Sequence, residues 1–329
     1  MLEGVGTRTG QAPAARIIIR AGHKNKGWGA RAQRPQLLGA IGMAEEPPVG
    51  RIIQGDAVKV LSDWPEGCVD LIFADPPFNI GYAYDRYRDD RPPEEYLAWT
   101  EKWIYACLHV LKSDGTFWIA IGDEYAAEIR VMMRRRASLR NWIIWHYTFG
   151  QNCTQKFNRC HTHLFYFVKD PQRFTFNDDD SALRVKSDRQ LKYNDKRANP
   201  DGKLPGDVWN EFPRVCGTFK ERVGWHPCQM PLALLERIVL ACSNPGDLVL
   251  DPFAGSGTTL LAAARHGRRW VGVELSKAYA TRARKRIAAG KAAGEPQPKG
   301  PLSHMGRTQR NNRIQREEKA TDSGRGVRL

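Results

Sequence analysis

Short apolar runs that end abruptly in turn residues are the feature that most limits how this chain folds. Residues 68–75, CVDLIFAD, form one such run, and residues 247–251, DLVLD, form another. An uninterrupted run of this length, closed by turn residues, is typical of a strand buried on both faces of a parallel sheet. Helical patterns lie between the runs, including 93–111, 230–243 and 276–290. The alternation predicts a doubly wound α/β fold with a mostly parallel sheet.

Two regions depart from this alternation. Aromatic-rich strands at 141–150 and 161–169 are predicted to pair as a terminal β-hairpin. Residues 171–217 are polar, charged and interrupted by Gly and Pro, which predicts an inserted segment outside the core, and long insertions tend to be functional. We expect one domain over 49–289, with disordered basic ends at 1–48 and 290–329 and a working start at Met43.

The charge of the chain favours a polyanionic partner. The formal net charge is +15 and the pI about 9.6. The two ends carry +4 and +5, which leaves +6 for residues 49–289. No run of about 18 apolar residues is present, so the sequence predicts no membrane span. Seven scattered cysteines, an odd number, favour a reducing compartment over a disulfide framework.

The first candidate site is the end of the apolar run at 68–75. It closes with Asp75-Pro76-Pro77-Phe78. Prolines end strands, which explains the stop but not the carboxylate and the aromatic ring beside it. Ligands of doubly wound sheets collect at the carboxyl ends of strands, so these side chains are placed to face one.

The second candidate site is LVLDPFAGSGTTL, residues 248–260. A strand ends at Asp251, and Gly255 and Gly257 permit a tight turn and a close approach to a ligand. Thr258 stands where a phosphate-binding P-loop needs Lys, and the third glycine of a dinucleotide fingerprint is missing. Asp251 suits a cationic group and Glu274, ending the next strand, suits ribose hydroxyls, so S-adenosylmethionine fits both. A purely structural turn remains open for this stretch.

Taken together, ADPPF at 74–78 and DPFAGSGTT at 251–259 resemble the catalytic and cofactor motifs of the amino-methylating DNA methyltransferases. The catalytic motif comes first, the circularly permuted order of that family's β group. Residues 226–231, HPCQMP, resemble the start of its cofactor-binding helix, with Cys228 and Met230 in place of the usual Thr and Lys. The resemblance covers 51–287 and leaves 171–217 unmatched. It implies a Rossmann-like, S-adenosylmethionine-dependent methyltransferase sheet.

The resemblance also implies the roles of individual residues. Asp75 and the Pro76 carbonyl would accept the two hydrogens of an exocyclic amino group on a flipped base, with Pro77 stiffening the turn and Phe78 stacking on the base. Asp56, at another strand end, would contact the adenine of the cofactor. The residues expected to bind the cofactor are Asp56, Pro227, Gln229, Asp251, Phe253, Ala254, Gly255, Ser256, Gly257, Thr258 and Glu274.

The activity implied is methylation of adenine N6 at a specific sequence in double-stranded DNA, with 171–217 as the target-recognition segment. The protein would act as a monomer or homodimer in the cytoplasm of a bacterial, archaeal or phage-infected cell, with a cognate restriction endonuclease as a further partner. Three alternatives remain open: methylation of cytosine N4, methylation of RNA or protein glutamine, and a catalytically inactive sequence-specific DNA-binding protein. Cys153, Cys160, His161 and His163 fit the hairpin as well as zinc, and no metal is expected.

Overall fold

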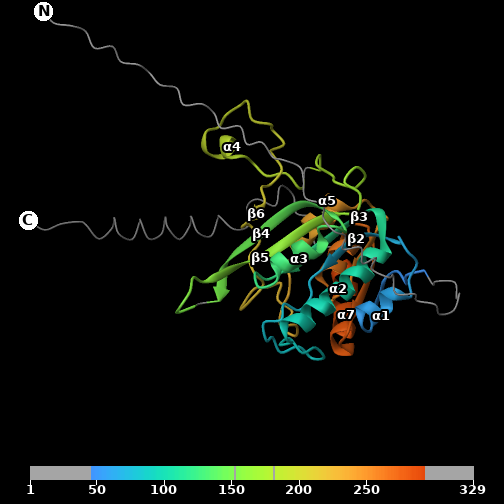
Figure 1. Ribbon diagram of the computed structural model, residues 1–329. Helices are drawn as coiled ribbons and strands as arrows, with labels where there is room; N and C mark the ends of the chain where they lie inside the picture. The colour runs from blue at the N-terminus through green and yellow to red at the C-terminus, as the bar shows by residue number, and fades with distance from the viewer. Residues whose placement is uncertain (1–45, 152, 181, 293–329) are drawn as a thin grey trace, which may run out of the picture. The chain divides into compact units, whose positions relative to one another are not determined.

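A sheet of eight strands forms the centre of the fold (Figure 1). The computed structural model describes residues 46–292, apart from residues 152 and 181. The strand order is β1-β8-β7-β2-β3-β5-β4-β6, and β5 is antiparallel to both of its neighbours while the other pairs are parallel. The strands are β1 (Arg51–Gln54), β2 (Val69–Ala74), β3 (Leu111–Ile121), β4 (Ser138–Gln151), β5 (Arg159–Val168), β6 (Val208–Trp209), β7 (Leu248–Asp251) and β8 (Arg269–Glu274).

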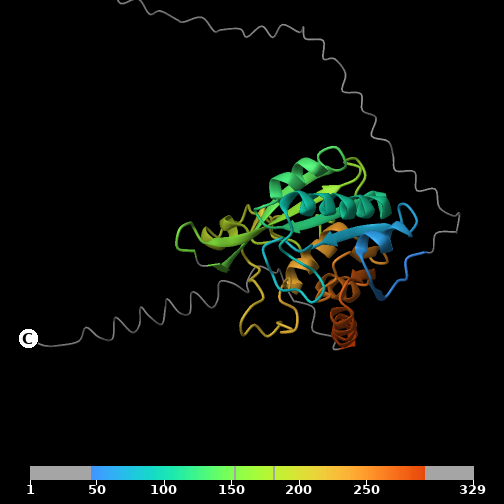
Figure 2. The same ribbon diagram turned by 60° about the horizontal axis from the view of Figure 1, so that its bottom comes forward.

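Helices cover both faces of this sheet. Figure 2 shows α2 and α3, coloured teal and green, on one side and the orange α7 on the other. The predicted doubly wound fold, with its terminal hairpin formed by β4 and β5, is confirmed. The helices are α1 (Ala57–Ser62), α2 (Pro93–Val110), α3 (Ala126–Met133), α4 (Asp188–Lys192), α5 (Leu232–Cys242), α6 (Thr258–Arg265) and α7 (Lys277–Ala292).

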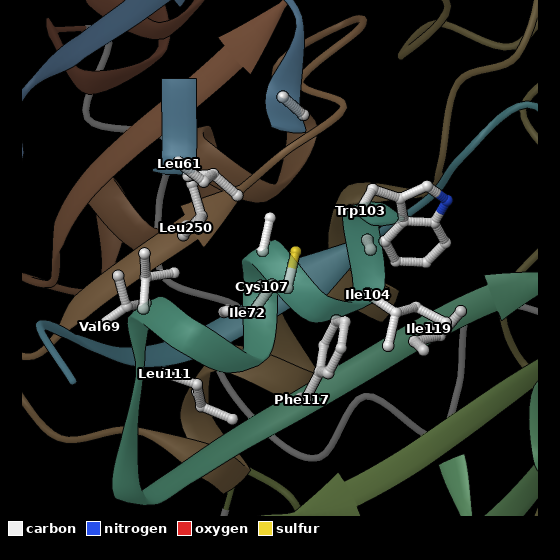
Figure 3. Close-up of a cluster of buried hydrophobic side chains, with 14 of the residues drawn as sticks. Leu61, Val69, Ile72, Trp103, Ile104, Cys107, Leu111, Phe117, Ile119 and Leu250 are labelled. Atoms are coloured by element: carbon white, nitrogen blue, oxygen red, sulfur yellow. The ribbon is translucent and has the colours of Figure 1, made fainter. Parts of the chain in front are cut away.

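Strand β2 explains why the sheet is covered twice. Its side chains alternate between two buried clusters: Ile72 and Ala74 pack with the first, and Leu71 and Phe73 with the second. The first cluster contains residues of α1, α2 and α3, and Figure 3 shows part of it around Trp103. The second contains residues of α5 and α6. A strand buried on both faces has no polar alternation, which is why its sequence is a continuous apolar run.

The chain leaves β2 and β7 in opposite directions. From β2 it passes through α2 to β3, and from β7 it passes through α6 to β8, while β2 and β7 are themselves hydrogen-bonded neighbours. This reversal is a topological switch point, where the loops after two adjacent strands part and leave a crevice for a ligand. The loops in question are those that begin at Asp75 and after Asp251.

The segment 171–217 lies only partly outside the core, which corrects the sequence-based prediction. Leu183, Trp209 and Phe212 are buried and join the second cluster, and Val208–Trp209 adds β6 to the edge of the sheet. Apolar residues spaced widely in a polar stretch produce no period, so the pattern gave no sign of this contribution. The predicted disordered ends fall outside the described residues except for 46–48 and 290–292, and α7 continues to Ala292.

Candidate active site

A cavity of about 330 Å³ opens at the switch point of the sheet. Asp75 after β2, Asp251 at the end of β7 and Glu274 at the end of β8 all line it, together with Asp56 after β1. These four strands are neighbours in the sheet, so their carboxyl ends bring four acidic side chains to one opening. The two motifs, about 175 residues apart in sequence, thus share a single cavity.

Most of the residues predicted for the site lie in the wall of this cavity. Those that line it are Asp56, Asp75, Pro77, Asp251, Phe253, Ala254, Gly255, Ser256, Thr258 and Glu274. Pro76, Phe78, Gly257, Pro227 and Gln229 are not among its lining residues.

The loop after β2 is held by buried hydrogen bonds rather than by its prolines alone. The Tyr96 hydroxyl donates to the Pro77 carbonyl at 2.8 Å. Asn79 adopts a left-handed φ of 59°, and its side chain donates to the Arg91 carbonyl at 2.9 Å and accepts from the Arg91 N–H at 2.7 Å. The buried Asp89 accepts the N–H groups of Asn79, Ile80 and Tyr82. Asp75 therefore sits at the start of a rigid loop.

The carboxyl groups of Asp75 and Asp251 are both hard to ionise. Burial raises the pKa of Asp75 to about 8, and the nearby negative charge of Asp251 adds to the shift. Burial also raises the pKa of Asp251 to about 7, although hydrogen bonds from Thr259 and from the Phe253 N–H at 3.0 Å oppose it. Two buried carboxyl groups with raised pKa values favour a positively charged ligand, because such a ligand stabilises their ionised forms.

The two glycines of the turn after β7 permit different contacts. Gly255 has a φ of 47°, and a Cβ atom placed there would come within 2.8 Å of His226 Nε2, at the cavity wall. Gly257 has a φ of 78°, and its Cβ would meet Ala283 of α7 at 3.1 Å. The first glycine thus lets the His226 ring of the cavity wall pack against the turn, whereas the second lets α7 pack against it.

Glu274 closes the opposite wall. Its carboxylate accepts the N–H of Gly255 and the N–H of Ser276, both at 2.8 Å, and burial raises its pKa. Asp56 is the N-cap of α1 and accepts the Lys59 N–H at 3.2 Å. Both acids are thus oriented by backbone N–H groups, which leaves their outer lone pairs for a ligand.

Aromatic side chains that were not predicted complete the cavity. Tyr84, Tyr87, Trp99 and Tyr279 line it, and the Trp99 ring lies 5.8 Å from the Phe253 ring. His226 also lines the wall, where burial lowers its pKa to about 4 and keeps the imidazole neutral. His226 and Cys228 belong to the HPCQMP stretch, which was the available signal. The others lie in loops and on helix faces where no short motif marks them.

Three of the residues predicted for the site have surroundings other than the cavity. Phe78 is half-buried and packs against both core clusters, close to Gly122, instead of lining the cavity. Pro227 is exposed. The side chain of Gln229 is buried, accepts the Val223 N–H and donates to the Glu221 carbonyl, both at 2.9 Å, so it braces the preceding loop.

The histidines of the hairpin pair with neighbouring rings. Trp142 Nε1 donates to His163 Nδ1 at 2.9 Å, and the His161 and His163 rings meet edge to face at 4.8 Å. In the part of the chain that the structure describes, no three His, Cys, Asp or Glu side chains are grouped so as to hold a metal ion. No helix within 46–292 has the length and apolar character needed to span a bilayer.

The predicted recognition segment reaches both ends of the sheet. It begins near the carboxyl end of α5, where Asn177 donates to the Leu240 and Ser243 carbonyls. It then returns along β4 through β6 to the cavity end, where Arg214 binds the Tyr82 hydroxyl at 3.3 Å. Gln190, a predicted base reader, caps α4 and donates to the Asn199 carbonyl at 2.7 Å. Base reading by 184–197 stays a prediction.

The comparison with protein families agrees with this geometry. A family model described as DNA methylase, of the N6 and N4 class, matches residues 69–285. The chain is 38% identical over 234 residues to the DNA adenine methyltransferase YhdJ of Escherichia coli, covering 69% of this chain and 79% of that protein. It is 37% identical over 239 residues to the type II methyltransferase M.HpaI of Haemophilus parainfluenzae, covering 72% and 74%.

Solved structures give the same fold. A DNA modification methylase of Thermus thermophilus, complexed with S-adenosylmethionine, is 27% identical with a TM-score of 0.52, covering 77% of this chain and 98% of that one. The M1.HpyAVI complex with S-adenosylmethionine is 25% identical with a TM-score of 0.51, covering 72% and 98%. The predicted family, enzyme class and cofactor are confirmed, and the chain belongs to the S-adenosylmethionine-dependent DNA methylases of the N6 and N4 class.

Proposed function

We propose that the chain transfers a methyl group from S-adenosylmethionine to N6 of adenine at a specific sequence in double-stranded DNA. One observation carries the proposal: Asp75 and Asp251 end adjacent strands and line the same cavity. A target base at the first and a cofactor at the second would then lie side by side. The name of the Escherichia coli relative, a DNA adenine methyltransferase, supports adenine as the target.

Asp75 and Pro76 form the target side of the proposed site. An exocyclic amino group is a poor nucleophile because its lone pair is delocalised into the ring. Asp75 would accept one amino hydrogen and the Pro76 carbonyl the other, which turns the lone pair outward. When ionised, Asp75 accepts such a hydrogen more strongly than an ordinary aspartate does, because burial raises its pKa to about 8, and the positive charge of a bound cofactor would favour the ionised form. The hydrogen bond from Tyr96 to the Pro77 carbonyl fixes the loop in the required orientation.

The cofactor side of the cavity has the groups that S-adenosylmethionine needs. When bound, the cofactor supplies an electrophilic methyl group and positive charge. Asp251 would hold its amino group, Glu274 its ribose hydroxyls, and the rings of Phe253 and Trp99 its flat base. The donor set of the cavity is the observation that fits such a ligand, because two acidic side chains and two aromatic rings line the same cavity.

The remaining predicted roles are part of the proposal. Phe78 packs at the junction of both core clusters beside Gly122, so stacking on the target base would use the ring face that is left exposed. Recognition of the DNA sequence would involve the returning part of 171–217, since Arg214 lies at the cavity end.

A bacterial, archaeal or phage-infected cytoplasm is proposed because the named relatives come from bacteria. A cognate restriction endonuclease is proposed from the type II relatives, and monomer or homodimer stays a prediction.

The test is the identity of the methylated base. Purified protein is incubated with methyl-labelled S-adenosylmethionine and duplex DNA, and the DNA is digested to nucleosides and separated. We expect the label in N6-methyl-2′-deoxyadenosine. Label in N4-methyl-2′-deoxycytidine would transfer the proposal to the alternative base, and cofactor binding without labelled DNA would favour a catalytically inactive DNA-binding protein.

A further inference from the structure

Strands β4 and β5 continue past the cavity end of the sheet as a two-stranded arm, residues 145–162. Ala74, the last residue of β2, pairs with Ile119 of β3, which pairs with Phe165 of β5. Strand β5 begins six residues before that level, at Arg159. The arm therefore extends roughly 20 Å beyond the level of Ala74, at about 3.4 Å per residue. Figure 1 shows it projecting away from the rest of the sheet.

The tip of the arm presents one apolar ring to solvent. The Phe157 side chain is 99% exposed, the highest value among the large apolar side chains of the described residues. The turn that carries it is closed by a 2.9 Å hydrogen bond from the Cys153 N–H to the Asn158 side chain. Arg159, at the root of the turn, is paired with Asp123 at 3.0 Å and with Glu124, which follow β3. This hydrogen bond and these ion pairs thus hold the turn in place while the Phe157 ring stays exposed to solvent.

The surroundings of Phe157 suit a nucleic acid more than an apolar protein surface. Residues 145–161 include no acidic residue, and Lys156 directly precedes the ring. The arm lies at the same edge of the sheet as the cavity that would receive a flipped base, two strands from β2, and it reaches further out toward the side from which a duplex would approach. Extrusion of a base leaves a gap in the stack, and flat apolar side chains fill such gaps.

We propose that Phe157 inserts into the DNA duplex beside the target adenine and occupies the space that the flipped base leaves. The inference rests on the proposed function, because it assigns a positioning role in the same reaction. Phe157 contacts neither the cofactor nor the reacting atoms, so it acts by stabilising the opened duplex. Its contribution is needed only while the target base is paired and stacked.

The experiment compares two substrates that contain the methylated sequence, once that sequence has been mapped. In one, the target adenine is paired with thymine, and in the other it faces an abasic site. We expect Phe157→Ala to lower kcat/KM on the paired duplex roughly tenfold or more, the scale of one lost stacking contact, and to leave the unpaired target within about threefold of wild type. Phe157→Leu, which keeps an apolar wedge, should retain most of the activity on the paired duplex.

The matched control is Val131→Ala on α3, which removes another exposed apolar side chain, 72% exposed, and should change neither substrate. An equal loss on both substrates would overturn the proposal, since it would indicate ordinary DNA contact or altered folding. Phe157→Ala activity equal to wild type on both would also overturn it and assign the ring to a protein partner. Absence of methylation by the wild-type chain on either substrate would instead contradict the proposed function.

Discussion

The two halves of the sheet differ in strand length and in what they support: β1-β8-β7-β2, called here the inner half, and β3-β5-β4-β6, called the outer half. The strands of the inner half have 4 to 6 residues, and an acidic side chain at or after the end of each lines the cavity. In the outer half, β4 and β5 have 14 and 10 residues and carry mainly aromatic and polar side chains past that edge. The inner half therefore provides a cavity for a small ligand, and the outer half extends far enough to contact a large one.

The difference also appears in how each half is fixed. Around the cavity, backbone N–H groups and buried carboxylates hold the loops, as Asp89 does for residues 79–82. In the outer half, the rings of Trp118 and Tyr166 stack at 4.7 Å, and Trp142 contacts Phe165 at 4.7 Å. Polar networks of the first kind specify one geometry, as chemistry requires. Substitutions in the inner half should therefore affect catalysis and cofactor binding, and those in the outer half should affect the DNA.

The largest effect should come from Asp75→Ala in the inner half. Removing the acceptor at the target should lower the methylation rate at least about a hundredfold, the scale of losing one positioned catalytic group. Affinity for S-adenosylmethionine, measured by calorimetry, should stay near wild type, because Asp251 and Glu274 remain in place. Asp75→Asn is the matched variant of equal size. A rate near wild type in both variants would remove Asp75 from the chemistry.

Gly255→Val should reduce cofactor affinity by about tenfold or more, which corresponds to about 1.4 kcal/mol of binding energy. The new side chain would collide with His226 at the cavity wall, where even a Cβ would lie 2.8 Å away. Gly267→Val is the matched control, since its φ of 72° imposes similar backbone strain while no atom lies within 4 Å of its Cβ. Equal affinities in calorimetry would make DPFAGSGTT a purely structural turn.

Cofactor affinity should also depend on pH. Burial raises the pKa of Asp251 to about 7 in the free protein, and a bound positive charge should lower it. Binding then favours the ionised form, so the contribution of Asp251 to affinity should be full above pH 8 and should fall by up to about tenfold per pH unit as the pH drops below 7. Calorimetry in buffers of different ionisation enthalpy should detect the released proton. Affinity that is constant from pH 6 to 8, or equally pH-dependent in Asp251→Asn, would contradict this assignment.

The smallest effects should come from substitutions within 171–217, and they should differ between two parts of that segment. Arg214, at the cavity end, should contribute to DNA binding, so Arg214→Ala should weaken binding and reduce the salt dependence by about one phosphate contact. Arg189→Ala, in the exposed helix α4, should change binding by less than about twofold, as surface substitutions away from an interface do. A change of the methylated sequence in Arg189→Ala alone would restore the sequence-based prediction for 184–197.

The inner half was the part that the sequence could predict. Buried parallel strands read as continuous apolar runs, and Asp75, Asp251 and Glu274 each end such a run, so their meeting at one edge follows from the α/β alternation. The aromatic lining was not predictable in this way. Trp99 and Tyr279 reach the cavity from helices that show no local signal for it, and Tyr84 does so from a loop whose course depends on the buried Asp89.

The outer half was harder to predict because its order depends on tertiary contacts. Trp209 and Phe212 stand in a polar stretch, yet both are buried, and their rings enclose the guanidinium of Arg237 at 4.9 and 4.4 Å. No periodicity marks residues that pack singly. Gln229 shows the converse limit, since its motif suggested a ligand and its side chain instead holds the loop at residues 221–223.

The central claim is that the loops after β2 and β7 form one active site for sequence-specific adenine methylation. Single-molecule sequencing of DNA from a host that expresses the chain tests it most directly. We expect N6-methyladenine at one defined sequence with the wild-type chain, and no such signal with Asp75→Ala or Asp251→Ala expressed at equal levels. Methylation that persists in either variant, or that is absent from adenine in the wild type, would contradict it.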